Sequence, residues 1–234
     1  MIMKRTIDQV NDNNFMHIFK YYKCNNNKPS FENVISFEKD KVTEKIYSED
    51  NKSVFPEDLA ELCDCIAQYL GYQDFKAEAA IVNYYHLSST LSAHTDHSEI
   101  NLEAPLFSFS FGQSAIFLIG GREKSVTPSA ILLESGDIAI MSKEARLSYH
   151  AVPKIVATAL EPWNNLENPS IDDKPITFMY ITDKQQLIND MNKNIDKNEW
   201  YLFGKYVKES RINMNVRQVL YKNQKCLHDV EFIK

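Results

Sequence analysis

The chain has 234 residues, of which 44% are hydrophobic and 25% are charged, and its formal net charge is −6. This composition is that of an ordinary globular protein and excludes a chain that is disordered throughout, while the length allows one large domain or two small ones. The negative charge excludes a global field that attracts nucleic acid, so any such binding needs a local basic patch.

The cysteines and the N-terminal residues indicate the compartment. The four cysteines include no CxxC pair, and Cys63 and Cys65 are too close together for an easy disulfide or a zinc knuckle. This cysteine pattern fits a reducing compartment best. The opening MIMKRTIDQVNDNNF lacks the apolar core of a secretory signal, and no run approaches the ~20 apolar residues of a membrane-spanning helix. We expect a soluble intracellular protein without a membrane partner, and leave nucleus, cytoplasm and mitochondrion open.

The first predicted elements are helices. Residues 1–54 are polar, with NDNN, CNNNK and EKDKVTEK between short apolar patches, and they predict one helix around 13–22 and little else. The pattern changes at Pro56. In PEDLAELCDCIAQYLGY a proline and two acids fall in the first turn, apolar residues recur at helical spacing, and Gly71 follows the last turn. This segment predicts an amphipathic helix.

Short β-rich runs separated by turn residues follow, namely AAIVNYYHL, PLFSFSFG, AIFLIGG, AILLE, DIAIM, LSYHAV and ITFMYI. Repeated short strands of this kind indicate a sandwich or a barrel. We expect a long surface loop between Pro153 and Pro175, helices over 184–209 and a last strand in RINMNVRQVL.

One candidate metal site begins at His94-Thr95-Asp96. Side chains alternate along an extended segment, so His94 and Asp96 project to the same side. His150 lies 54 residues after Asp96, at the end of another predicted strand. Two histidines and one carboxylate form the facial triad of non-haem Fe(II) oxygenases. Because chance pairs of this kind are common, ordinary surface or core histidines remain the alternative.

The last predicted strand carries polar and apolar residues on opposite faces. If Ile212, Met214 and Val216 pack outward under helices, Arg211 and Arg217 face the interior, where they are costly without anions. A dicarboxylate would meet that need, because a guanidinium matches a carboxylate in two hydrogen bonds. A solvated outer face is the alternative.

Together, NYY, HTD, SFSFG, RLSYH and RINMNVR resemble the motifs of the AlkB family of Fe(II)- and 2-oxoglutarate-dependent dioxygenases. Within the family, PLFSFSFGQSAIFLIGG, SGDIAIMS, HAVP and NMNVRQVL most resemble the AlkB homologue 1 branch. The similarity runs from about Tyr47 to Leu220, and the ordered set is more specific than any single motif. The resemblance implies an α+β fold with a double-stranded β-helix (jelly-roll) core and flanking helices.

The resemblance also implies the iron ligands, which are His94, Asp96 and His150. His86 and His97 are not needed as ligands, and we expect them to be surface residues or neighbours of the site.

The cosubstrate residues are implied in the same way. Arg211 would pair with the distal carboxylate of 2-oxoglutarate, helped by Tyr85 and Asn213. Arg217 and Asn83 would hold the end of 2-oxoglutarate that chelates iron.

The implied reaction is oxidative demethylation. Fe(II), 2-oxoglutarate and molecular oxygen together oxidise an N-linked methyl group, which leaves as formaldehyde, while 2-oxoglutarate becomes succinate. The expected partners are tRNA with 1-methyladenosine or another RNA, and DNA with 6-methyladenine as a second candidate. A base in a duplex must be flipped out, so an RNA loop is the easier target. Glu99 and Arg146 are the candidate substrate contacts, and the sequence does not indicate the oligomeric state.

One departure from the family pattern concerns the N-terminal region. Relatives carry substrate-recognition loops before the stretch corresponding to KVTEKIYSEDNKSVFPEDL, whereas here FENVISFEKD runs almost directly into it. We therefore expect a shortened substrate-recognition lead-in (1–54), a dioxygenase core (55–221, with an insert of loop and helices over 153–209) and a tail (222–234). The second hypothesis is a catalytically impaired core that binds metal and 2-oxoglutarate and acts as a binding or regulatory module.

Overall fold

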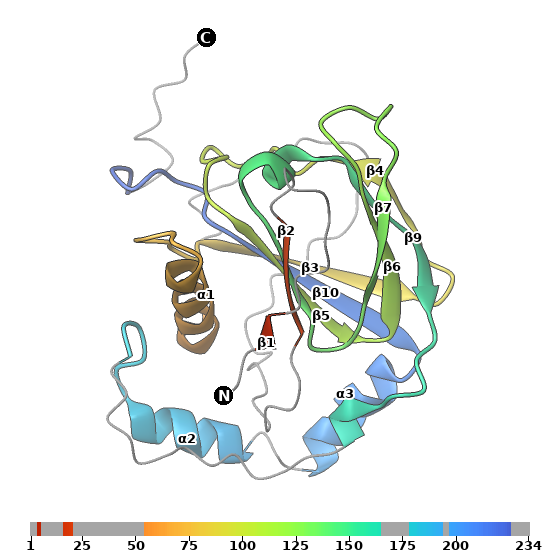
Figure 1. Cartoon of the computed structure of the whole chain (residues 1–234). Helices are drawn as coiled ribbons and strands as arrows, with labels where there is room; N and C mark the ends of the chain where they lie inside the picture. The colour runs from red at the N-terminus through yellow and green to blue at the C-terminus, as the bar shows by residue number, and fades with distance from the viewer. Residues whose placement is uncertain (1–3, 6–15, 21–53, 165–177, 194–196, 226–234) are drawn as a thin grey trace.

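Two antiparallel sheets organise the computed structural model, which describes residues 4–5, 16–20, 54–164, 178–193 and 197–225. The large sheet has the strand order β1-β2-β8-β5-β10-β3, and the small sheet has the order β4-β9-β6-β7. Figure 1 shows the large sheet crossing the centre of the molecule, with β6, β7 and β9 beside it.

The strands are β1 (Lys4–Arg5), β2 (Met16–Lys20), β3 (Ala79–His86), β4 (Leu91–His94), β5 (Leu106–Gly112), β6 (Ser114–Ile119), β7 (Ser129–Leu133), β8 (Ile138–Met141), β9 (His150–Val156) and β10 (Ser210–Arg217). Among the described residues the α-helices are α1 (Glu57–Tyr69), α2 (Lys184–Lys193) and α3 (Lys197–Val207), and short 3₁₀ helices span Lys143–Leu147 and Pro162–Asn164. The predicted strands are therefore confirmed at β3 and from β5 to β10, as are the helices after residue 183.

Three predictions about local structure are wrong. The predicted helix around 13–22 contains strand β2, which pairs with β8, so pairing with the sheet outweighs the helical pattern. His150 begins β9 instead of ending a strand, and β9 continues to Val156, so the predicted loop starts later than Pro153. Residues 178–181 of ITFMYI form no strand, and the rest of that run lies outside the described residues.

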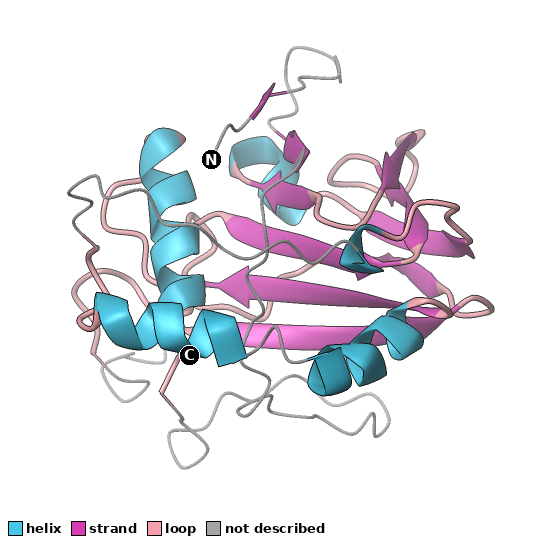
Figure 2. Cartoon of the chain, turned by 90° about the horizontal axis from the view of Figure 1, so that it is seen from below, coloured by secondary structure: helices cyan, strands magenta, loops and turns pink. Residues whose placement is uncertain are grey.

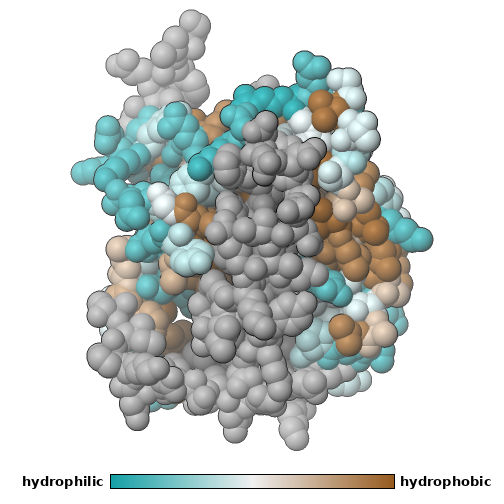
Figure 3. Space-filling view, viewed as in Figure 1, coloured by the Kyte–Doolittle hydropathy of each residue, from teal (hydrophilic) through white to brown (hydrophobic). Residues whose placement is uncertain are grey.

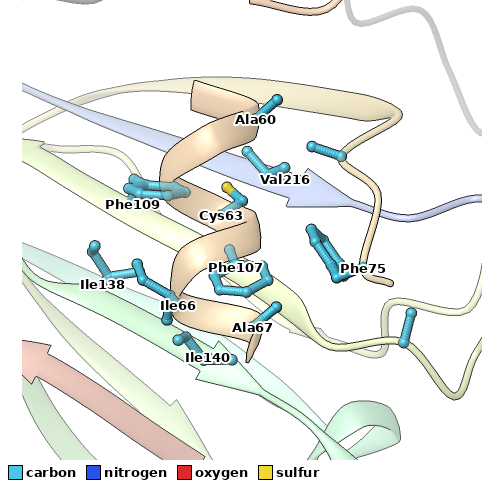
Figure 4. Packing of buried hydrophobic residues seen from close by; sticks show 12 residues of the cluster. Ala60, Cys63, Ile66, Ala67, Phe75, Phe107, Phe109, Ile138, Ile140 and Val216 are labelled. Carbon is cyan, nitrogen blue, oxygen red and sulfur yellow. The ribbon is translucent and has the colours of Figure 1, made fainter. Parts of the chain in front are cut away.

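Helix α1 covers the outer face of the large sheet. Its N-cap is Pro56, and Gly71, with a φ of +87°, follows its end. Its buried side chains include Cys63 and Ile66, which pack with Phe107 and other apolar residues of β5, β8 and β10 (Figure 4). The sheet supplies alternate residues to this contact, as the period of a strand requires. The helix thereby supports β5 and β10, and the opposite faces of these two strands carry polar residues toward the interior.

The opposite face of the large sheet meets the small sheet. Apolar residues of β3, β5 and β8 form a second buried cluster with those of β6, β7 and β9, including Leu106, Phe117 and Leu133. Helix α3 instead packs on the outer face of β10 through Val207 and Ile212, and Figure 2 shows the helices around the strands. The apolar side chains of the two sheets therefore fill part of the space between them.

The surface carries scattered apolar residues. Figure 3 shows apolar side chains gathered on the right of the view, where Figure 1 places β6 and β7. Leu132 of β7 is one of the exposed apolar residues. None of the helices in the described ranges is long and apolar enough to cross a membrane.

Candidate metal centre

Two histidines and one aspartate converge at one end of the small sheet. His94 ends β4, His150 begins β9, and the two are register partners with ring centroids 4.4 Å apart. Oδ2 of Asp96 lies 3.5 Å from Nε2 of His150. One possible ligand atom from each residue lies within 4.8 Å of those of the other two. The structure therefore brings the three predicted ligands close enough to converge on a single ion.

Main-chain hydrogen bonds fix which nitrogen of each histidine faces the cluster. Nδ1 of His94 donates to the carbonyl oxygen of Ser92 at 2.9 Å, and Nδ1 of His150 donates to that of Ser148 at 3.1 Å. A carbonyl oxygen only accepts, so the proton of each neutral ring sits on Nδ1. Each Nε2 then offers a lone pair, and this is how protein shells usually orient metal-binding imidazoles.

Asp96 is held in its ionised form. Burial raises the pKa of this carboxyl, but the polar contact with His150 and the charge of Arg217 outweigh burial and hold the pKa well below its usual range. Nη2 of Arg217 donates to Oδ1 at 2.7 Å. Oδ2 is buried, and within the described part of the chain it has no hydrogen-bond partner.

These features fit a metal ion. Asp96 and His150 are buried and His94 is half-buried. An anionic oxygen and two imidazole lone pairs that converge in such a place are unfavourable without a cation between them. Two histidines and one carboxylate also leave coordination positions open, which suits a ferrous ion that must bind further ligands.

The strand β10 presents a polar face to the interior beside this cluster, as expected for outward packing of its apolar residues. Arg211 is 2% exposed, and its described polar contacts are uncharged, to Oγ of Ser110 at 2.8 Å and to the carbonyl oxygen of Gln113 at 3.3 Å. Its Nε is buried and has no hydrogen-bond partner among the described residues. Burial lowers the pKa of this guanidinium to about 10, so it remains charged at neutral pH.

Strand β3 places the other predicted cosubstrate residues beside β10. Tyr85 is the register partner of Arg211, and Asn83 is the partner of Asn213. Paired residues on antiparallel strands project to the same face. Nδ2 of Asn83 donates to Oδ1 of Asn213 at 3.3 Å. The structure therefore groups these four residues on one face, and their roles toward 2-oxoglutarate stay predictions.

The remaining predicted residues form a buried ionic cluster. Arg217 contacts both Asp96 and Glu99, and Nη2 of Arg146 lies 2.7 Å from Oε2 of Glu99. The charge of Arg217, followed by contacts with Arg146, outweighs burial and lowers the pKa of Glu99 to about 2. Glu99 is only 4% exposed, so the structure places it among arginines instead of on an open surface.

Some site residues were missed from the sequence, and others lie apart from the cluster. Ser108 and Ser110 line the interior face of β5, where the alternation in LFSFSF was a usable signal, and Ser110 contacts Arg211. His86 and His97 are exposed and are not among the clustered ligands.

Antiparallel sheets that carry a two-histidine, one-carboxylate cluster define a protein of the non-haem metal type. A profile of the 2OG-Fe(II) oxygenase superfamily matches residues 11–217. The chain belongs to this superfamily, whose members use Fe(II) and 2-oxoglutarate.

Individual relatives refine the comparison. The chain is 42% identical over 180 residues to the nucleic acid dioxygenase ALKBH1 of Homo sapiens, covering 77% of this chain and 44% of the relative. It is 46% identical over 116 residues to the tRNA demethylase abh1 of Schizosaccharomyces pombe, covering 49% and 38%. It is 33% identical over 147 residues to the DNA N(6)-methyladenine demethylase ALKBH1A of Arabidopsis thaliana, covering 63% and 36%. These matches confirm the predicted resemblance, and the chain spans less than half the length of these relatives.

Proposed function

We propose that the chain is an Fe(II)- and 2-oxoglutarate-dependent dioxygenase that oxidatively demethylates N-methylated bases in nucleic acid. We favour tRNA with 1-methyladenosine over DNA with 6-methyladenine as the substrate. The single observation that carries the proposal is the convergence of His94, Asp96 and His150, whose ligand atoms lie within 4.8 Å of one another.

These three residues would hold Fe(II). When bound, the ion would supply the oxidising chemistry, using 2-oxoglutarate and molecular oxygen. The chain orients the ligands through the main-chain bonds to Nδ1 of His94 and His150, and Arg217 fixes the carboxylate of Asp96. Such preorganisation is the main contribution that a protein makes to cofactor chemistry.

Arg211 supports 2-oxoglutarate as the cosubstrate. The described hydrogen bonds of this buried guanidinium go to uncharged groups, and the charge of Asp137 offsets its burial only in part, so a further anion would stabilise it. A carboxylate would accept two parallel hydrogen bonds from it. Tyr85, Asn83 and Asn213 lie on the same interior face and would bind other polar atoms of the same molecule. Arg217 contacts Asp96 in this structure, and we keep it as a candidate for the end of 2-oxoglutarate near the metal.

The relatives support nucleic acid as the substrate class, because those named above carry the names nucleic acid dioxygenase, tRNA demethylase and DNA N(6)-methyladenine demethylase. An unpaired RNA base needs no extrusion from a duplex, which favours a tRNA loop. Glu99 and Arg146 are buried, so any effect that they have on the substrate would be indirect.

We also propose that the two sheets form a double-stranded β-helix core over residues 55–221, with loop and helices inserted over 153–209. Residues 1–54 would be a shortened substrate-recognition lead-in and 222–234 a tail. The support is the antiparallel pairing of both sheets and the superfamily match over 11–217.

The test is a turnover assay of the purified chain with Fe(II), 2-oxoglutarate and oxygen. A tRNA stem-loop with 1-methyladenosine, the same unmethylated stem-loop and a DNA strand with 6-methyladenine are compared. We expect formaldehyde and succinate in equal amounts from the methylated RNA, and slower release from the DNA.

His94→Ala should abolish the release, and His86→Ala is the matched control because His86 is exposed and outside the cluster. Binding of 2-oxoglutarate without formaldehyde from any methylated strand would contradict the demethylase proposal. It would support a binding or regulatory module instead.

A further inference from the structure

The candidate metal ligand Asp96 and three other buried charged side chains form one ionic cluster. Nη2 of Arg217 lies 2.7 Å from Oδ1 of Asp96, and Nη1 of Arg217 contacts Oε1 of Glu99. The other oxygen of Glu99, Oε2, lies 2.7 Å from Nη2 of Arg146. Glu99 therefore binds two guanidinium groups, one through each carboxylate oxygen.

The charges of this cluster balance, yet its burial is costly. The side chain of Glu99 is fully buried, and those of Arg146 and Arg217 are 3% and 1% exposed. Well-packed apolar residues usually stabilise a fold as well as a buried ion pair does. Stability alone therefore gives no reason to place these charges next to Asp96, whereas control of geometry does.

Arg146 ties the same cluster to the main chain. Its Nη1 donates to the carbonyl oxygen of Asp96 at 2.6 Å, and its Nε donates to that of Ala104 at 3.1 Å. One guanidinium thus holds the backbone of Asp96, the backbone of Ala104 and the carboxylate of Glu99. The segment between β4 and β5, which has no regular secondary structure of its own, is fixed by this side chain.

We propose that Glu99, held by Arg146, is a positioning residue for the metal ligand Asp96. Glu99 occupies Nη1 of Arg217, so Arg217 binds Asp96 through Oδ1 alone and Oδ2 stays directed at His150. Without Glu99, Arg217 is released to form a forked pair with both oxygens of Asp96. Arg217 would then compete with the metal for Oδ2.

This inference rests on the proposed function, because it assigns Glu99 to the metal site instead of the substrate contact expected from the sequence. It predicts a specific defect in metal binding. Removal of an outer partner of a metal ligand typically lowers metal affinity about 10- to 100-fold.

The test is a titration with Co(II) alone, followed by the visible absorption of the protein-bound ion, together with thermal unfolding of the metal-free protein. We expect Glu99→Gln to lower Co(II) affinity about tenfold or more and to change the absorption spectrum. Glu78→Gln is the matched control. Glu78 also binds the chain near β10, accepting from the main-chain nitrogens of Val219 and Leu220 at 2.8 Å, but it lies outside the metal cluster. The control should unfold at a lower temperature with unchanged Co(II) affinity.

A second variant covers the case in which Glu99→Gln does not fold. The paired change Glu99→Leu with Arg146→Met removes both members of an ion pair, a change that buried pairs tolerate best. We expect it to fold and to bind Co(II) at least about tenfold more weakly.

Two results would overturn the proposal in distinguishable ways. If the unaltered protein and His94→Ala bind Co(II) equally, the metal site fails and the inference fails with it. If Co(II) binding needs His94 but a folded Glu99 variant keeps the original affinity and spectrum, only the positioning role fails.

Discussion

Arg217 binds one oxygen of Asp96 and leaves the other to the histidines. The Nη2 to Oδ1 distance is 2.7 Å, while Oδ2 lies 3.5 Å from Nε2 of His150. Arg217 is also the last residue of β10, the strand on which Arg211 lies. One strand thus carries the partner of a candidate metal ligand at one end and Arg211, which we propose to bind 2-oxoglutarate, near the other.

Replacing Arg211 should separate stability from function. Arg211→Met removes a buried charge whose described hydrogen bonds go to neutral groups and whose burial the charge of Asp137 only partly offsets, so we expect the free energy of unfolding of the ligand-free protein to rise by about 1 kcal/mol or more. The same variant should lose the rise in melting temperature that 2-oxoglutarate causes in the metal-loaded protein. Thermal denaturation with and without 2-oxoglutarate measures both effects.

Arg122→Met serves as the control for that variant, because the side chain of Arg122 is 59% exposed and pairs only with Glu144 among described carboxylates. It should leave both quantities unchanged. A less stable Arg211→Met protein that still responds to 2-oxoglutarate would show that Arg211 does not bind this anion.

The close packing around Gly112 fixes the position of β10, the strand that carries Arg211. Gly112 pairs with Arg211 across β5 and β10, has a φ of +77°, and a Cβ there would meet the carbonyl oxygen of Ser210 and lie 2.9 Å from Cβ of Val207. We expect Gly112→Ala to lower the free energy of unfolding by about 3 kcal/mol, from backbone strain and overpacking together. It should also weaken 2-oxoglutarate binding, because β10 must shift.

Gly71→Ala is the matched comparison, since Gly71 has a φ of +87° but open space around its Cβ position. Only the strain of about 1–2 kcal/mol applies there. Equal destabilisation by both substitutions in urea unfolding would contradict the close approach of Gly112 to Ser210 and Val207.

The contribution of Glu99 to stability should depend on pH in a defined window. The pKa of Glu99 is lowered from 4.5 to about 2 in the folded protein, so folding favours the ionised form. The stabilisation is fully present above about pH 4.5 and is lost as the pH falls toward about 2. This pH-dependent part of the free energy of unfolding is on the order of 3 kcal/mol.

The measurement is the difference in the free energy of unfolding between the unaltered protein and Glu99→Gln at several pH values. We expect a constant difference above about pH 4.5 that shrinks at lower pH. A difference that grows as the pH falls would mean that Glu99 is protonated in the folded protein.

The sequence predicted those features that depend on local pattern. Pro56, the acids after it and Gly71 marked the ends of α1. The alternation in RINMNVR separated a polar from an apolar face, and the motif resemblance then implied that Arg211 lies inside, where the structure buries it. The His-x-Asp spacing placed two ligands on one side of an extended segment. The motif resemblance added His150, which spacing alone left open.

Features that depend on pairing between distant residues could not be predicted in this way. Arg146 and Glu99 are 47 positions apart, and nothing in their local sequence indicates that they share a buried ion pair. For the same reason Glu99 was assigned to the substrate. The strand β2 was missed because its partner β8 lies more than a hundred residues away, and pairing of this kind outweighs local propensity.

We propose above all that His94, Asp96 and His150 hold one ferrous ion, to which 2-oxoglutarate binds with the help of Arg211. Anaerobic titration of the purified chain with Fe(II) and then 2-oxoglutarate, followed by the visible absorption of the 2-oxoacid chelated to Fe(II), tests it most directly. We predict a band that saturates at one Fe(II) per chain, is lost in His150→Ala, needs much more 2-oxoglutarate in Arg211→Met, and is unchanged in His86→Ala. A band of full intensity in His150→Ala, or no band in the unaltered protein, would contradict the claim.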